Sequence, residues 1–340
     1  MKVPEPRKMS SGNWFIQMRL GGVSTTVTAA TKTECVRQAT LIKAEHKAGK
    51  RVAIKTPNEL TLKEACERYI VKYQKTLSPS TVRGYTIYKD QRFRAYQDKK
   101  LTEINWQKMI DDELAIKSEK TVKNAWGLVH PALVEAKFPI PEVKLAKAPI
   151  NEIAFLQPEE ILPFCEAVKG RSYEIASLLE LHGMRLSEVR GLTWENVDLR
   201  RGFISVKGAK VRGIDGDVMK ETNKNETSTR LVPILIPQLT EALTSVKDKT
   251  GPVVKAQSNT LLDDVKRSCK RAGVTIVTNH GLRHSFASLG YHLKISERQM
   301  MQWGGWKDFQ TMHKIYIRLA AIDETEAKAT MTKFFTENAK

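Results

Sequence analysis

The sequence predicts a multidomain, mainly α-helical chain. We expect a small β-sheet-plus-helix N-terminal module, a helical middle domain and a mixed α+β C-terminal domain. The 340 residues exceed one domain of roughly 150 residues. The apolar pattern changes along the chain, from strand-like alternation to helical spacing and then to longer helices with one polar β-region. Segments 50–58 and 138–149 have the composition of linkers. We therefore expect domains at 1–55, 59–143 and 152–340.

The charge balance is strongly positive, with 56 Lys and Arg against 38 Asp and Glu, a net charge of +18. The excess of positive charge is densest in residues 1–58, which contain 11 basic and 3 acidic side chains. Each Lys or Arg that meets a phosphate releases a counterion, so a polyanion such as nucleic acid is the simplest partner. Solubility alone would also explain the charge.

Composition excludes several classes of protein. The hydrophobic fraction of 41% and the charged fraction of 28% are typical of a globular chain. No run approaches the ~20 apolar residues that span a bilayer, and the first residues carry no apolar signal core, so we expect a cytoplasmic protein without a membrane partner. The four cysteines are far apart without CxxC spacing, which favours reduced, buried thiols over a zinc site.

The N-terminal module is expected to contain a hairpin and a helix. Segments 14–20 and 23–29 have β-prone, partly alternating residues, and Gly21-Gly22 supplies the turn. Thr31 followed by Glu34 is typical of a capping box, which predicts a helix to about Ala48. A small, strongly basic sheet-plus-helix unit suits a reader of a DNA groove.

Three helices are predicted in the middle domain, over 62–73, about 79–96 and about 119–135. Thr61 with Glu64 has the pattern of a second capping box, which begins the first helix. Ser78 is the N-cap of the second helix and is followed by Pro79 at the first helical position, and Ser118 begins the third helix. One side of this domain is basic: Lys63, Lys72, Lys75, Arg83, Lys89, Arg92, Arg94, Lys99 and Lys100. A solvated helix face would look the same.

The C-terminal domain combines helices with two predicted strands, 203–206 and 230–234. A helix is expected to end at Gly183 and another to begin near Ser187, which would leave Arg185 at the junction with Glu188 within reach. The tail from Asp323 to Lys340 begins with another capping box and carries apolar residues at helical intervals.

Four short segments of this domain carry candidate chemistry. They are HGMRLSEVRGLTW (182–194), the polar NKNETSTRLVP (223–233), HGLRHSFA (280–287), and GGWKD (304–308) followed by Tyr316. An HxxR at a helix start can cradle a phosphate beside the positive end of the helix. Each segment alone is more often a turn, a hairpin or a core residue than a site.

Their order resembles the tyrosine recombinase (phage integrase) family. GMRLSEVRGLTW is similar to its first arginine box, HGLRHSFAS to its second, and GGWKDFQTMHKIYIRL to its tyrosine box. The overall pattern resembles integrases of temperate phages and integrative elements from low-GC Gram-positive bacteria. The resemblance implies an arm-type DNA-binding module, a helical core-binding domain and a catalytic domain.

The family's reaction implies a role for each matching residue. Tyr316 matches the nucleophile that forms a 3′-phosphotyrosyl link, and Arg185 with Arg283 match the pair that clamps the phosphate oxygens, since guanidinium is planar, charged and bidentate. Lys224 matches the general acid on the leaving 5′-oxygen.

Three further residues match supporting positions. His280 is the histidine of HxxR, Trp306 occupies the His/Trp position where an indole N–H can donate to phosphate, and Glu188 matches the acidic residue that supports the site. Lys220 remains the alternative to Lys224, because the insertion from Lys207 to Met219 enlarges the hairpin region. From Trp306 to Tyr316 is ten residues where the family pattern has nine.

The resemblance also implies the setting of the reaction. It implies no metal and no ATP, double-stranded DNA with core and arm-type attachment sites, and a homotetramer on that DNA. A host bending protein and an excisionase are further partners, in a bacterial cytoplasm at the nucleoid. The tail at about 323–340 would be an exchange helix that docks on a neighbouring protomer, although packing on its own domain is the alternative.

Two other functions compete with a recombinase that integrates and excises a phage or mobile element. A type IB topoisomerase-like enzyme would share the tyrosine chemistry, but the basic N-terminal module and the exchange helix disfavour it. A DNA-binding regulator without catalysis would have no need of Tyr316.

Overall fold

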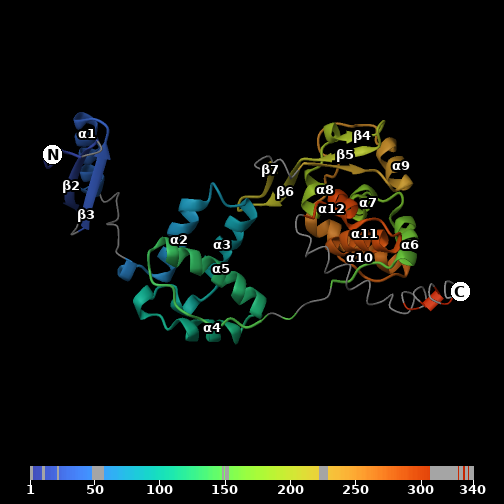
Figure 1. Cartoon of the computed structure of the whole chain (residues 1–340), viewed down its shortest axis with the longest axis horizontal. Helices are drawn as coiled ribbons and strands as arrows, with labels where there is room; N and C mark the ends of the chain where they lie inside the picture. Colours follow the sequence, from blue (N-terminus) through green and yellow to red (C-terminus); the bar gives the residue numbers. More distant parts are fainter. Residues whose placement is uncertain are drawn as a thin grey trace. The chain divides into compact units, whose positions relative to one another are not determined.

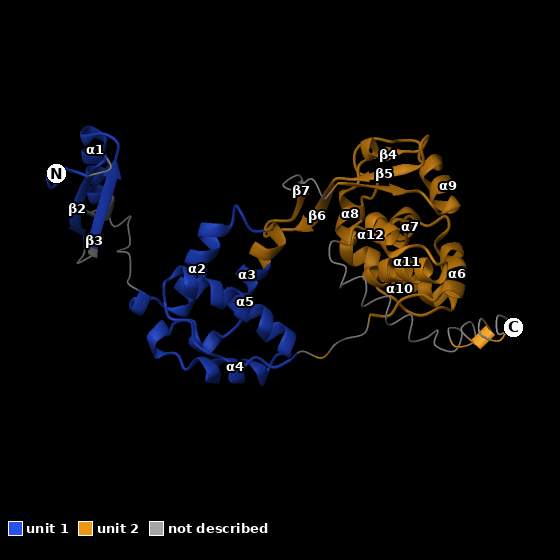
Figure 2. Ribbon diagram, viewed as in Figure 1, with its two compact units in different colours: residues 1–77, 84–148 blue, residues 78–83, 149–340 orange. Residues whose placement is uncertain are grey.

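The computed structural model describes residues 3–9, 12–20, 23–47, 57–147, 149, 153–221 and 229–306, together with residues 328, 332, 333 and 336 (Figure 1). Helices dominate and the sheets are small. The chain divides into two compact units, residues 1–77 with 84–148 and residues 78–83 with 149–340 (Figure 2). Within the described residues, no helix is both long enough and apolar enough to cross a bilayer. The predicted three-domain layout stays a prediction.

The predicted N-terminal hairpin is confirmed. Strands β2 (Trp14–Leu20) and β3 (Val23–Ala29) pair antiparallel, and β1 (Arg7–Lys8), which was not predicted, pairs with β2. Helix α1 (Lys32–Lys47) packs on this sheet. Their shared core consists of Ile16, Met18, Val27, Cys35 and Ala39. This core is small, as expected for a module of this length.

One of the two hydrogen bonds of a capping box is seen at the start of α1. The Glu34 N–H donates to Thr31 Oγ1 at 3.2 Å. The Glu34 carboxylate accepts hydrogen bonds from Arg37 and Gln38 within the helix. The sequence pattern therefore predicts the start of the helix correctly, while a nearby guanidinium competes for the carboxylate.

Four helices make up the middle of the chain: α2 (Leu62–Tyr73), α3 (Pro79–Gln91), α4 (Trp106–Leu114) and α5 (Glu119–Glu135). Both halves of the Thr61–Glu64 capping box are present at α2. Ser118 caps α5 by accepting from the Thr121 N–H. The predicted spans of α2 and α5 are confirmed.

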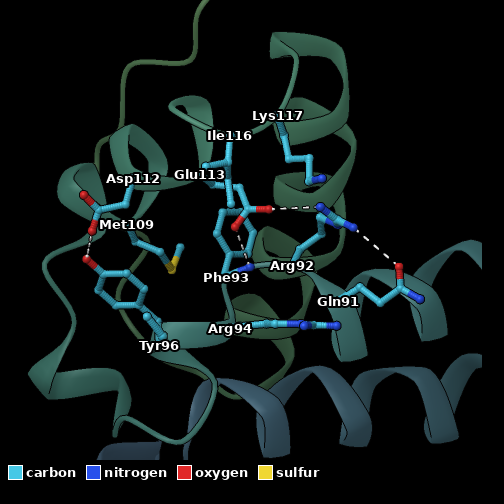
Figure 3. Close-up of a pocket in the computed structure, with 11 residues that line it drawn as sticks. Gln91, Arg92, Phe93, Arg94, Tyr96, Met109, Asp112, Glu113, Ile116 and Lys117 are labelled. Carbon is cyan, nitrogen blue, oxygen red and sulfur yellow. Dashed lines mark hydrogen bonds and ion pairs between the residues drawn. The ribbon is translucent and has the colours of Figure 1, made fainter.

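The predicted span 79–96 is too long, because α3 ends at Gln91. Phe93 follows with a left-handed backbone, at φ 51°, and is buried. Its N–H donates to Glu113 Oε2 at 2.8 Å, and Arg92 Nη1 donates to Glu113 Oε1 at 3.3 Å (Figure 3). Glu113 belongs to α4, so a contact from a distant helix ends α3.

Helix α4 was not predicted. Asn105 caps it by accepting from the Lys108 N–H at 3.1 Å. Residues 138–147, within the predicted linker, form neither helix nor strand. Part of this segment is held by α4, since the Gln107 side chain accepts from Lys144 N at 2.8 Å and donates to Lys144 O at 3.3 Å.

The C-terminal unit contains seven described helices: α6 (Pro158–Val168), α7 (Glu174–Leu181), α8 (Leu186–Gly191), α9 (Pro237–Ser245), α10 (Ser258–Ala272), α11 (Asn279–His292) and α12 (Glu297–Gly304). Helix α7 packs against α8, α9 and α11 (Figure 1). Helices α6, α7 and α10 each contribute to the main core, with Phe164, Val168, Leu178, Leu179, Leu261 and Val265.

Two small sheets flank these helices. Strands β4 (Val197–Asp198), β5 (Phe203–Val206) and β8 (Arg230–Pro233) form one sheet in that order. The strands predicted at 203–206 and 230–234 are thus confirmed, the second one residue shorter. The inserted segment forms a second hairpin, β6 (Gly208–Arg212) and β7 (Asp217–Glu221), which was not predicted.

Two of the predicted site residues, Lys224 and Tyr316, lie outside the described residues. Of the predicted tail helix, four residues are described, and all four have helical backbone. In this part Thr336 Oγ1 donates to Thr332 O at 3.0 Å, as in an isolated helical turn.

Candidate active site

The junction between α7 and α8 presents Arg185. Helix α7 ends at Leu181, and Gly183 turns the chain with φ +81°. A Cβ at Gly183 would lie 2.6 Å from the Phe286 ring, so both space and backbone require glycine there. Arg185 then precedes α8, and its N–H donates to Glu188 Oε2 at 2.9 Å. The predicted helix break and the predicted reach of Glu188 are both confirmed.

The guanidinium of Arg185 has two described contacts. Its Nη1 donates to Glu188 Oε1 at 2.8 Å, and its Nη2 donates to the carbonyl of Gly305 at 3.0 Å. The side chain is 44% exposed, so it can reach a ligand at the surface while Glu188 fixes its direction.

Arg283 is the most deeply buried charge of the site, with 2% of the residue exposed. It lies in the second turn of α11, and its Nη1 donates to the carbonyls of Gly183 and Gly304. Burial and the nearby Arg185 lower the pKa of Arg283 to about 9, which leaves it protonated at neutral pH. Among the described residues, its Nη2 has no hydrogen-bond partner.

His280 lies one turn before Arg283 at the start of α11, and Thr278 caps that helix by accepting from the Gly281 N–H. Its ring meets the ring of His284 edge-on, with centroids 4.7 Å apart. Partial desolvation, then the charges of Arg283 and Arg185, lower the pKa of His280, so the imidazole is neutral at physiological pH. His280 is exposed to solvent.

Trp306 closes the site from the end of α12. Its indole stacks on Phe286, with ring centroids 6.4 Å apart. The central carbon of the Arg283 guanidinium lies 4.1 Å from the centroid of the same indole. Only 8% of Trp306 is exposed. The preceding glycines make this possible, because a Cβ at Gly304 would lie 1.8 Å from the indole. The GGW segment is therefore a packing requirement as well as a sequence motif.

Sequence reasoning missed the part that Arg230 plays in this cluster. Arg230 pairs with Glu188, which also accepts from Arg185, and the side chains of Arg230 and Glu188 are each 10% exposed. The strand pattern of β8 could have indicated this position. Leu231 is exposed and Val232 is buried, and residues two apart in a strand share a face, so Arg230 lies on the same inward side as Val232. Glu188 therefore accepts from two arginines. Burial alone would raise its pKa, but the hydrogen bond and charge of Arg230, and then the backbone N–H and charge of Arg185, lower it to about 2.

The structure thus gathers Arg185, Glu188, His280, Arg283 and Trp306 around the ends of α7, α11 and α12. Lys224 and Tyr316 cannot be added, since they lie outside the described residues. Lys220 lies on β7 opposite Ala209. In the described ranges, no three His, Cys, Asp or Glu side chains are grouped to hold a metal ion. A cluster of guanidiniums beside a helix start can bind and polarise an oxyanion.

Comparison with protein families matches residues 153–322 to the model of the phage integrase family. Among curated proteins, a XerC-like tyrosine recombinase of Caldanaerobacter subterraneus subsp. tengcongensis is 25% identical over 216 residues, covering 54% of this chain and 55% of that protein. The integrase of Salmonella phage P22 is 22% identical over 204 residues, covering 57% and 51%. The chain therefore spans about half the length of these relatives.

Solved structures share the fold. The integrase of the Tn1549 transposon, in complex with transposon right end DNA, superposes with a TM-score of 0.63 at 16% identity, over 79% of this chain and all of that one. A lambda integrase tetramer bound to a Holliday junction gives a TM-score of 0.55 at 17% identity, over 90% and 98%. Both likenesses concern the arrangement of helices and small sheets.

Proposed function

The chain belongs to the phage integrase family, and we propose that it is a site-specific DNA recombinase that cuts and rejoins DNA through a 3′-phosphotyrosyl intermediate. The curated relatives are tyrosine recombinases and an integrase, and the integrase structures that share the fold hold DNA. The same chemistry is proposed here for this chain, with double-stranded DNA as substrate.

One observation carries the proposal, namely the buried Nη2 of Arg283 that has no described partner. Burying a charged donor without an acceptor costs free energy, so such a group is retained where a ligand supplies the acceptor. Arg185 lies close enough to lower the pKa of Arg283, and its side chain is 44% exposed. Two guanidinium groups close to one point can donate hydrogen bonds to the non-bridging oxygens of a phosphodiester.

The reaction needs a nucleophile and a proton donor, which we assign to Tyr316 and Lys224. The phenol of Tyr316 would give its proton to the neutral imidazole of His280 or to water, and its oxygen would attack phosphorus. A P–O bond to tyrosine would form, and the bond to the 5′-oxygen would break. Lys224 would give that leaving oxygen its proton. Religation reverses these steps, so the phosphodiester energy is conserved in the covalent link and no ATP is consumed.

The described residues supply charge stabilisation in this scheme. Arg185 and Arg283 would stabilise the negative charge that grows on the phosphoryl oxygens, and neutral His280 would hydrogen-bond the same group. Glu188 would hold Arg185 in place. Trp306 would either donate its indole N–H to phosphate or cover one face of the Arg283 guanidinium with its ring. Fixed cations can provide the stabilisation that a metal provides elsewhere.

The N-terminal module is proposed to bind arm-type sites. On β2, Phe15, Gln17 and Arg19 alternate with the buried Ile16 and Met18, so they share the face of the sheet away from α1. Gln17 and Arg19 are exposed there, and Arg7 of β1 pairs opposite Phe15. A face with guanidinium and amide groups can read base edges and phosphates. Residues 59–143 would bind the core site and residues 152–340 would carry catalysis.

The wider assignment follows from the same family. We propose that the protein works as a homotetramer on DNA and integrates and excises a phage or another mobile element in a bacterial cytoplasm, at the nucleoid. The tail at 323–340 would link protomers as an exchange helix. A host bending protein and an excisionase would complete the assembly and set its direction.

Substitution of the nucleophile tests the proposal. Incubation with a nicked duplex that spans the attachment junction of the parent element should yield an SDS-resistant protein–DNA adduct. Tyr316→Phe should abolish the adduct and leave DNA binding intact. An adduct that forms equally well with the Phe variant would overturn the assignment.

A further inference from the structure

Arg230 opens β8, opposite Val206 of β5. Its strand neighbours alternate: Leu231 is 57% exposed and Val232 is fully buried. Arg230 shares the inward side with Val232, and its side chain is only 10% exposed. An arginine in that position is held by partners inside the fold rather than by water.

The three guanidinium nitrogens of Arg230 are all engaged. Nη1 and Nη2 donate to Glu188 Oε1 and Oε2 at 3.2 and 2.7 Å, and Nε donates to the carbonyl of Trp303 at 2.9 Å. This differs from Arg283, whose Nη2 lacks a partner among the described residues. Each nitrogen of Arg230 already donates inside the fold and the side chain is only 10% exposed, so we expect Arg230 to act through its neighbours rather than on a substrate.

The first of these neighbours is Glu188, whose two carboxylate oxygens each accept from both Arg230 and Arg185. Arg185 donates to both Glu188 oxygens, through Nη1 at 2.8 Å and through its backbone N–H at 2.9 Å. A carboxylate that is shared in this way cannot turn freely toward either arginine. Without Arg230, the buried Glu188 would have Arg185 as its remaining described cation and would bind it more tightly.

The second neighbour is the end of α12, where three consecutive carbonyls each accept from a different arginine. Trp303 O accepts from Arg230, Gly304 O from Arg283 and Gly305 O from Arg185. The C-terminal end of a helix carries partial negative charge, which favours cations there. Close approach is possible because Gly305, at φ +66°, has no side chain; a Cβ would lie 2.7 Å from the Arg230 guanidinium.

We propose that Arg230 is a positioning residue of the recombinase site, which sets the orientation of Arg185 through Glu188 and anchors the end of α12 beside both phosphate-binding arginines. Arg230 touches neither DNA nor the reacting atoms in this scheme. The inference deepens the proposed function and rests on it. It predicts that the chemical step depends on Arg230 while DNA binding does not.

The test measures single-turnover adduct formation and DNA affinity on the nicked junction duplex, with the full chain. Arg230→Gln should slow adduct formation about 10²-fold, the scale expected when a catalytic group is misplaced by about 1 Å, with affinity within about twofold. Glu188→Gln should slow it similarly, and the double variant should be no slower than the slower single variant, because the two residues act as one unit. Additive losses would overturn the proposal.

Arg190 provides the matched control. It is also a buried arginine, with a side chain 6% exposed, paired with Asp217 and donating to Ser258 Oγ at 2.8 Å. Its contacts serve the β6–β7 hairpin and the start of α10. Lys220 lies on β7 and Lys224 follows that strand in the sequence, so this control is read on Glu188 and not on the adduct rate. Arg190→Gln should lower thermal stability as Arg230→Gln does, yet leave the titration of Glu188 unchanged. Equal shifts of that titration in both variants would reduce Arg230 to a fold stabiliser.

Arg230→Lys covers the case in which Arg230→Gln does not fold. An ammonium keeps the charge but cannot pair with both Glu188 oxygens and the Trp303 carbonyl in the fork geometry of arginine. The adduct rate should fall at least about tenfold at unchanged affinity, by the same misplacement argument. A Lys variant as fast as the parent protein would overturn the proposal.

A measurement without DNA separates this inference from the proposed function. The carboxyl carbon resonance of Glu188, followed by NMR against pH, should titrate at higher pH in Arg230→Lys than in the parent protein and should not move in Arg190→Gln. An unchanged titration would overturn the inference, whether or not an adduct forms. Absence of any adduct from the parent protein, with the titration shifted, would overturn the proposed function and leave the Arg230–Glu188–Arg185 coupling standing.

Discussion

The guanidinium of Arg283 lies over the indole of Trp306, with its central carbon 4.1 Å from the ring centroid. Phe286 stacks on the same indole. The aromatic face attracts the cation while it shields it from water, which strengthens the field of Arg283 toward any anion that approaches. Trp306 therefore has a task that depends on its ring and is separate from its N–H group.

Substitution of Trp306 distinguishes the ring from the N–H group. Trp306→Phe keeps an aromatic face under Arg283 and removes the donor, whereas Trp306→Ala removes both. If the ring is what matters, the adduct rate should fall about 10²-fold in the Ala variant and less than about tenfold in the Phe variant. Equal losses in single-turnover assays would assign the effect to the N–H group.

The two proposed phosphate-binding arginines should differ in their effect on folding. Arg185→Ala should lower the adduct rate about 10² to 10³-fold, the usual cost of one lost oxyanion donor, with little change in thermal stability because the side chain is 44% exposed. Arg283→Ala should lose a similar factor and also melt at a lower temperature, since its Nη1 joins Gly183 to Gly304. Calorimetry on both variants checks this; unchanged adduct rates would contradict the proposed clamp.

His182 predicts a loss of stability in acid. Its Nδ1 meets the Leu178 carbonyl and its Nε2 accepts from the N–H groups of Leu235 and Ile236. Burial lowers the pKa of His182 to about 4, below its ordinary value of 6.5. The unfolded chain then binds more protons, so stability should fall as pH drops from about 6.5 toward 4.

Urea unfolding of the parent protein and His182→Gln between pH 4 and 8 measures this effect. The Gln variant should be less stable at pH 8 but should lose less stability on acidification. Parallel pH profiles for the two proteins would contradict the assignment.

Glu180 predicts the opposite trend. It is fully buried, and both of its oxygens accept from Asn279 Nδ2, at 2.9 and 2.8 Å. Burial raises the pKa of Glu180 to about 8 from 4.5, so the folded state binds the additional proton. Its contribution to stability is present below about pH 4.5 and is lost as pH rises to about 8. Glu180→Gln, measured by the same unfolding series, should flatten this loss; a loss as steep as that of the parent would refute it.

Removal of residues 1–55 tests the two DNA contacts separately. The truncated chain should lose its footprint on arm-type DNA and keep adduct formation at the crossover site. Binding by the full chain should also weaken steeply with added salt, as expected when Lys and Arg displace counterions. Unchanged footprints and unchanged recombination after truncation would argue against an arm-binding module.

Local patterns predicted those elements that local contacts hold. The Thr61–Glu64 box and Ser118 begin helices where expected, and the pairing of β2 with β3 follows from the alternation of Ile16 and Met18 with polar residues. The break between the two helices before Arg185 was also predicted from the sequence, because Gly183 permits the turn.

Elements that depend on distant partners were not predicted. Helix α3 ends early because Phe93 donates to Glu113 from another helix. The β6–β7 hairpin is anchored by Arg190 through Asp217, a pairing across 27 positions. In the site, the motif identified Arg185 and Arg283. The pairing of Arg230 with Glu188, through which Arg230 reaches Arg185, joins residues 42 positions apart and needs the folded sheet.

The recombinase reaction requires a covalent bond between DNA and the phenol oxygen of Tyr316. Mass spectrometry of the trapped adduct, after nuclease trimming and proteolysis, detects this bond. One modified peptide is expected, with a nucleotide joined through its 3′-phosphate to Tyr316. A nucleotide on any other residue, or a 5′-linked nucleotide, would show that Tyr316 is not the nucleophile of such a reaction.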